Sequence, residues 1–261
     1  MSYPTPSYLY NLNPHPRDTH ITFDEGPHIY TVDGDSNYTS VTTIVHQHFG
    51  KFDSDKVIQN IKNGKKWNEN NKYWGMTDEE IKELWKENGR VSAEKGTIMH
   101  YNIECFYNND TSRLDNDDSL EKQYFMNFYN DHKHMKPYRT EWTVWDKELK
   151  VSGSIDMVFE NEDGTLSIYD WKRTKAIKKL SFKNVCSNTP CLEHIPDCNF
   201  WHYSMQLNIY KYMLEKNYNK TIKDIYLVKI HPNNHNQNYI KIKCADMQNE
   251  IKDIMNLRLN N

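Results

Sequence analysis

The spacing of hydrophobic residues changes about half-way along the chain. Up to about residue 134, apolar residues recur three and four positions apart, which predicts helices. From residue 140 the pattern alternates with a period of two, which predicts strands. The predicted strands are 140–145, 151–159, 166–172, 225–230 and 239–244. The predicted helices among and after them are 204–216 and 246–257. A mixed α/β fold follows, with a mostly helical N-terminal region.

Local signals predict the elements of the N-terminal half. The first twenty residues contain four prolines and predict an irregular arm. Alternation around a Glu-Gly-Pro turn predicts a hairpin of 20–23 and 28–32. Ser40 has the hydroxyl of a helix N-cap, Thr77 and Glu80 form a capping box, and Ser92 is expected to begin a further helix that ends at Phe106. One more helix is predicted at 121–131. We expect residues 1–90 to pack on a core of residues 91–261 as one structural unit.

Composition narrows the class of protein. Charged residues make up 26% of the 261 residues, and 18 Tyr and 7 Trp are too many for a disordered chain. No apolar run is long enough for a membrane span, and the first residues lack the pattern of a signal peptide, so no membrane partner is expected. Five irregularly spaced cysteines favour a reducing compartment. We expect an intracellular protein of the cytoplasm, the nucleus or a viral factory, not a secreted one. The sequence does not determine its oligomeric state.

Two aspartates and a lysine form the strongest candidate site. Asp170 and Lys172 are two residues apart in the third predicted strand, so both side chains project from one face while Trp171 points the other way. Asp156 lies fourteen residues before Asp170 in the preceding strand, and a turn rich in Asn, Asp and Gly separates the two. A hairpin would bring the aspartates together. Surface charge on a hairpin is the alternative, but the neighbouring residues are apolar and make ionised groups costly unless they are paired or bind a metal.

Two helical pairs could join this site. His100 and Glu104 are four residues apart, so an imidazole and a carboxylate share a helix face and could hold one metal ion. The alternative is a solvated surface pair. Gln206 and Tyr210 have the same spacing on the predicted helix after the strands. They could orient a phosphate or bases, or could hydrogen-bond within the core.

Positive charge is concentrated directly after Lys172. The segment from Lys172 to Lys183 has six basic residues and no acidic one, although the chain as a whole has a formal net charge of −3. Such a segment can bind backbone phosphates without regard to sequence. The predicted phosphate-binding residues are Arg173, Lys175, Lys178, Lys179 and Lys183. Aromatic residues that could stack on unpaired bases, or pack in the core, are Trp67, Tyr73, Trp74 and Trp201.

Other chemistries have weaker signals. Cys191, His194, Cys198 and His202 offer zinc ligands at close spacing, but no CxxC pair is present, so ordinary loop residues are the alternative. Serine-elbow, Walker-type and dinucleotide-binding motifs are absent from the sequence. The chain therefore lacks the sequence signals of a serine hydrolase or an NTPase.

The order of these motifs resembles the PD-(D/E)XK nuclease superfamily. Within it, the chain is similar to the RecB-type exonucleases, which include the mitochondrial genome maintenance exonuclease and exonucleases of large DNA viruses. The resemblance covers about residues 92–210 and rests on Gly96-Thr-x-x-His100, Gly153-x-x-Asp156, Asp170-Trp-Lys172 and Gln206-x-x-x-Tyr210. Two features depart from the family: Ile155 replaces the proline before Asp156, and the iron–sulfur cysteines of some relatives are missing.

The resemblance implies a restriction-endonuclease-like core that cuts DNA with Mg²⁺ or Mn²⁺. The implied metal ligands are His100, Glu104, Asp156, Asp170 and the main-chain carbonyl of Trp171. Lys172 would be the active-site lysine, and Gln206 and Tyr210 would lie beside the site. The expected substrates are single-stranded DNA or duplex ends, and the expected role is in replication, recombination or repair. An endonuclease of the same fold, and a non-catalytic nucleic-acid-binding protein, are the alternatives.

Overall fold

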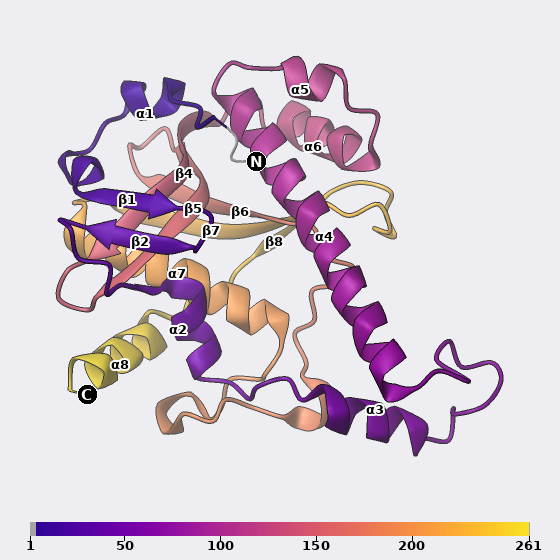
Figure 1. Ribbon diagram of the computed structural model, residues 1–261. Helices are drawn as coiled ribbons and strands as arrows, with labels where there is room; N and C mark the ends of the chain where they lie inside the picture. Colours follow the sequence, from indigo (N-terminus) through magenta and orange to yellow (C-terminus); the bar gives the residue numbers. More distant parts are fainter. Residues whose placement is uncertain (1–3, 261) are drawn as a thin grey trace. The chain divides into compact units, whose positions relative to one another are not determined.

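The computed structural model describes residues 4–260 and divides the chain into two compact units. The smaller unit is Lys51–Ile98, and the larger unit consists of the described residues before and after it (Figure 1). The helices are α1 Tyr8–Leu12, η1 Pro16–His20, α2 Val41–Gln47, α3 Ser54–Lys62, α4 Asp78–Tyr107, α5 Ser112–Asp115, α6 Leu120–Asp131, η2 Phe182–Asn184, η3 Pro190–Leu192, α7 Asn199–Asn217 and α8 Gln248–Leu259. None of these helices in the described part of the chain is long and apolar enough to cross a membrane.

A mixed sheet forms the centre of the larger unit, as the alternating pattern predicted. Its strands are β3 Thr39–Ser40, β4 Lys136–Asp146, β5 Val151–Glu160, β6 Leu166–Lys172, β7 Ile222–Lys229 and β8 Ile240–Lys243. The order is β3-β5-β6-β7-β8, and β4 pairs with the other edge of β5. The β3/β5 and β6/β7 pairs are parallel, and the β4/β5, β5/β6 and β7/β8 pairs are antiparallel. The predicted α/β class is confirmed.

Helices cover both faces of this sheet (Figure 1). Leu166 and Ile168 of β6 pack in a core with residues of α2, α7 and α8. Tyr169 and Trp171 of the same strand pack with residues of α6 and the end of α4. Because side chains alternate along a strand, Asp170 lies on the α7 face of the sheet.

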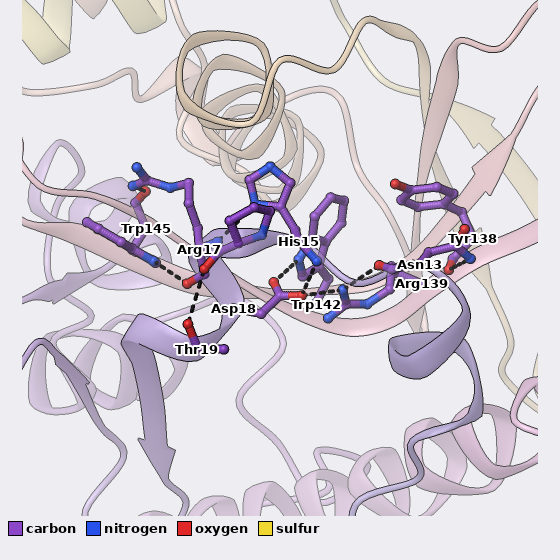
Figure 2. A network of polar contacts seen from close by, with 10 residues as sticks. Asn13, His15, Arg17, Asp18, Thr19, Tyr138, Arg139, Trp142 and Trp145 are labelled. Atoms are coloured by element: carbon purple, nitrogen blue, oxygen red, sulfur yellow. Dashed lines mark hydrogen bonds and ion pairs between the residues drawn. The ribbon is translucent and has the colours of Figure 1, made fainter.

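The N-terminal segment is not the irregular arm that its prolines suggested. It forms α1 and η1 and is followed by a hairpin of β1 Ile21–Asp24 and β2 Ile29–Val32. Asp18 of η1 is buried and accepts hydrogen bonds from Arg139 Nη1 at 2.7 Å and Trp142 Nε1 at 2.9 Å (Figure 2). The prolines are compatible with this structure because Pro16 occupies the first position of η1, where a free N–H is not needed.

The prediction that Ser92 begins a helix is wrong. Helix α4 is continuous from Asp78 to Tyr107, and Ser92 is exposed within it. A serine acts as an N-cap only where the preceding chain leaves the helix, and here Arg90 pairs with Glu87 and Glu94 across one turn on either side. Helix α7 also begins five residues earlier than predicted, at Asn199 instead of Ser204.

The smaller unit contains α3 and the first part of α4. Asp53 caps α3 by accepting from Lys56 N, and Thr77 and Glu80 form the predicted capping box of α4. Its core consists of the buried residues Ile58, Tyr73 and Ile81 with partly buried Trp67 and Trp85 packed against them.

Candidate metal site

Strands β5 and β6 separate at the candidate site. Met157↔Tyr169 is the pair closest to the site, and the following residues of β6 pair with β7 alone. Beyond that point the side chain of Asp156 replaces the missing ladder bond, because its Oδ2 accepts from Trp171 N at 2.9 Å. The separation places a carboxylate between two strands of the sheet.

His100, on the last part of α4, faces this carboxylate. Its Nε2 lies 2.8 Å from the carbonyl oxygen of Trp171, and its Nδ1 lies 3.4 Å from Asp156 Oδ2. A carbonyl oxygen only accepts, so Nε2 carries a hydrogen. Loss of the proton on Nδ1 would make that second ring nitrogen available as a metal ligand. The Trp171 carbonyl, which the family resemblance implied as a ligand, therefore orients His100 in this structure.

Glu141 on β4 is a site residue that the sequence argument missed. The pairs Thr140↔Met157 and Trp142↔Ile155 place it opposite Asp156, and its Oε1 is 3.9 Å from His100 Nδ1. Ser154 Oγ donates to Glu141 Oε2 at 2.8 Å. The backbone of Glu141 has a φ of 39°, an unusual value for a non-glycine residue that often marks a functional position. The hairpin register of the two predicted strands could have identified it.

His100, Glu141 and Asp156 form a group suited to a metal ion. One ligand atom from each residue lies within 4.8 Å of the other two. Two carboxylates directly opposite each other in a sheet repel, which a divalent cation between them would relieve. One nitrogen and two oxygen ligands are compatible with Mg²⁺ or Mn²⁺. The donor set and its surplus negative charge therefore fit a divalent metal ion.

Asp170 and Lys172 form a buried ion pair, as their spacing in β6 predicted. Lys172 Nζ lies 2.9 Å from Oδ1 and 2.8 Å from Oδ2 of Asp170. Burial raises the pKa of Asp170 to about 6, although Lys172 opposes the shift. Burial lowers the pKa of Lys172, but Asp170 and Asp156 outweigh it and raise the pKa above its ordinary value. The ring of Tyr203 on α7 lies 4.6 Å from Nζ.

The remaining charges of the site also reflect burial and crowding. Burial and the charge of Glu141 raise the pKa of Glu104 to about 8. Burial lowers the pKa of His100, but the carboxylates of Asp156 and Glu141 more than compensate and raise it to about 9. Glu104 is therefore near the site electrostatically, although it is not one of the three clustered ligands.

Tyr210 and Gln206 reach the site from α7. Tyr210 is buried, and burial raises the pKa of its hydroxyl, a shift that the nearby Gln206 side chain opposes. Gly153 of β5 makes the close approach of Tyr210 possible, because a Cβ there would lie 2.7 Å from the tyrosine hydroxyl oxygen. The structure thus places this predicted helix pair against the strand that carries Asp156.

The basic residues after β6 have different environments. Arg173 is held in an ion pair with Glu121 at 2.8 Å, and both side chains are largely buried. Four others are exposed: Lys175, Lys178, Lys179 and Lys183. Of the four aromatic residues proposed to stack on bases, Tyr73 is buried in the core of the smaller unit, and Trp201 packs against that of the larger unit. Trp74 is half exposed.

The zinc alternative is not supported. His194 pairs with Glu250 at 3.2 Å, and His202 pairs with Asp197 at 3.0 Å. Within residues 4–260, the group suited to a metal is that of His100, Glu141 and Asp156, and no cysteine belongs to it. The cysteines of the segment are free thiols.

Comparisons with known proteins show structural likenesses of low identity. Neither a protein-family model nor a curated protein matches the chain. A candidate exonuclease from Eubacterium rectale is similar at 11% identity and a TM-score of 0.44, over 86% of this chain and 78% of its own. The protein SSO0001 is similar at 14% identity and a TM-score of 0.38, over 87% of this chain and 76% of its own. The function of this chain is therefore inferred from its own site.

Proposed function

We propose that the protein is a metal-dependent nuclease that hydrolyses phosphodiester bonds in DNA, of the RecB-type group of the PD-(D/E)XK superfamily. One observation carries this proposal: His100, Glu141 and Asp156 converge on one point at the separation of β5 and β6. The buried Asp170–Lys172 pair on the next strand completes the acid and lysine set.

The chain offers ligands for one divalent cation, Mg²⁺ or Mn²⁺. His100, Glu141 and Asp156 would hold it, with Asp170 as a further acid. Such a cation, when bound, polarises a phosphate oxygen and lowers the pKa of a water ligand.

Lys172 supports hydrolysis as a cation. Its raised pKa keeps the ammonium group protonated at neutral pH, so it is not the general base. A fixed positive charge beside the metal site stabilises the negative charge that grows on the phosphate oxygens in the transition state. Tyr203 and Asp170 position Nζ for this role.

Substitution of Asp170 by Asn, or of Lys172 by Met, tests the catalytic role. We expect each variant to lose at least about 100-fold of the Mg²⁺-dependent cleavage rate, because each removes charge from the site. Asp163→Asn and Lys223→Met form a matched control, since that exposed pair has the same types of partner at 2.9 Å. Full activity of the Asp170 variant would exclude the proposed site.

Circular and linear DNA substrates distinguish an exonuclease from an endonuclease. We propose an exonuclease, so circular single-stranded DNA is expected to remain uncut while linear single strands or duplex ends are degraded. Cleavage of the circle would instead identify an endonuclease of the same fold. Substrates labelled at the 5′ or the 3′ end give the direction of digestion in the same assay.

A further inference from the structure

The loop that follows β6 exposes apolar side chains among lysines. Leu180 and Phe182 are 80% and 81% exposed, the highest values among the large hydrophobic residues of the described chain. Four exposed lysines lie in the same loop: Lys175, Lys178, Lys179 and Lys183. No acidic residue occurs between Asp170 and Glu193. This loop combines positive charge with accessible apolar area and contains no acidic residue.

Hydrogen bonds attach residues 176–179, the first stem of this loop, to α7. Asn199 Oδ1 accepts from Lys178 N at 2.8 Å, and Asn199 Nδ2 donates to Ala176 O at 2.7 Å. Trp201 Nε1 donates to Lys179 O at 3.1 Å. Ile177 packs against the main core, unlike its apolar neighbours further along the loop.

The second stem of the loop, Val185 and Cys186, is also held in place. The tip between the two stems, residues 180–184, therefore projects from a fixed base. Asp197 N donates to Val185 O at 2.9 Å, and Cys186 pairs with Pro196 in an isolated β-bridge. Between the stems, Lys183 and Asn184 both have a φ of 56°, which turns the chain sharply. Leu180 and Phe182 are therefore presented on a preorganised turn.

The anchored stem lies close to the candidate catalytic lysine. Asn199 and Tyr203 are one turn apart on α7, about 6 Å along the helix axis. The Tyr203 ring lies 4.6 Å from Lys172 Nζ. A nucleic acid strand whose phosphate reached Lys172 would meet the base of this loop within a nucleotide or two.

We propose that Leu180 and Phe182 contact the unpaired bases of a single nucleic acid strand, while the loop lysines bind its phosphates. The inference rests on the proposed function and specifies its substrate class. Phosphates attract the lysines, and bases whose faces are exposed offer a flat apolar surface to the tip. A duplex hides these faces within its stack, so an unpaired strand matches the combined surface better.

Binding without metal tests the proposal apart from cleavage. In EDTA, we expect the full chain to bind a short oligothymidylate about 10-fold more tightly than an abasic strand of equal length, measured by fluorescence anisotropy. In Leu180→Ser/Phe182→Ser this preference for bases should disappear. Leu12→Ser/Leu259→Ser is the matched control, because these exposed leucines lie outside the loop, and it should keep the preference.

Charge substitutions separate the two parts of the surface. Lys178→Gln/Lys179→Gln should weaken binding of the oligothymidylate and of the abasic strand about equally. It should also reduce the dependence of the binding affinity on salt concentration. An undiminished base preference in the double-serine variant would overturn the inference. So would tip-dependent binding to phosphatidylserine vesicles with no base preference. Failure of the proposed function would give a different result from failure of this inference. If the protein cleaves no DNA with Mg²⁺ but keeps the tip-dependent preference for bases, the loop inference alone is supported.

Discussion

At the scale of single residues, the candidate site holds more negative charge than its cations neutralise. Three carboxylates, those of Glu141, Asp156 and Asp170, lie near two groups of positive charge, Lys172 and protonated His100. Burial raises the pKa of Asp156 and Asp170, and the lysine and histidine offset this shift only in part. The excess charge in a buried place is the physical reason to expect a cation there.

Glu104 should make the metal-free protein less stable as pH rises. Its folded pKa, about 8, is above its ordinary value of 4.5, so between these values the folded state retains a proton that the unfolded state has released. The stability that protonated Glu104 contributes is fully present below pH 4.5 and is lost as the pH rises towards 8. Glu104→Gln lacks this loss and should exceed the wild type in free energy of unfolding by about 1 kcal/mol or more near pH 8.

Urea denaturation at about pH 5 and pH 8 in EDTA measures this difference. Glu83→Gln on the same helix is the control, because Glu83 is 71% exposed and should change stability equally at both values. If Glu104→Gln raises the free energy of unfolding equally at both pH values, Glu104 is not protonated in the folded protein.

At the scale of elements, the contact between α7 and β5 depends on one glycine. In Gly153→Ala the new methyl would lie 2.7 Å from the Tyr210 hydroxyl oxygen and 2.8 Å from its ring carbon Cε1. The tyrosine must move, so we expect a loss of about 1–3 kcal/mol of stability together with reduced cleavage. Thermal unfolding and initial cleavage rates give the two effects.

A second substitution identifies the cause of this effect. Tyr210→Leu removes the hydroxyl and ring, so Gly153→Ala should cost much less stability in that background. Gly89→Ala is the control, because a Cβ there meets no atom within 4 Å and should stabilise α4 by about 0.5–1 kcal/mol. Additive effects of the Gly153 and Tyr210 changes would contradict the steric explanation.

The N-terminal elements are joined to the sheet by a buried charge network (Figure 2). Asp18→Ala would leave the Arg139 guanidinium, whose side chain is 4% exposed, without its carboxylate partner. We expect a loss of about 3–5 kcal/mol in free energy of unfolding. Asp24→Ala, on the exposed hairpin, should change stability by about 0.5 kcal/mol or less. A loss as small as that in the Asp18 variant would show that residues 4–20 contribute little to the fold.

At the scale of the whole molecule, the metal site should couple ion binding to stability. A ligand that binds only the folded state stabilises it by about 2.7 kcal/mol at 100 times its dissociation constant. We therefore expect Mg²⁺ or Mn²⁺ to raise the melting temperature, and Glu141→Gln to abolish the increase. Glu162→Gln, on an exposed turn, should retain it. An equal increase in the Glu141 variant would exclude Glu141 as a ligand.

Local patterns in the sequence predicted most elements of the fold. The period of two placed Asp170 and Lys172 on one face of β6, and the buried ion pair confirms it. The capping signals at Ser40 and Thr77 are also confirmed, since each depends on residues three apart. The capping signal at Ser92 gave a wrong prediction, because the residues before Ser92 are already helical and α4 continues through it.

The sequence by itself determined the mixed α/β class and the acid–lysine strand, because periodicity and capping are properties of a few adjacent residues. Only the tertiary structure placed Glu141 opposite Asp156, since that contact depends on strand register and on an unusual backbone angle. It alone brought His100 to Trp171, 71 residues away, and Asp18 to Arg139, 121 residues away. Contacts of such separation arise from how the packed elements meet, which no local pattern encodes.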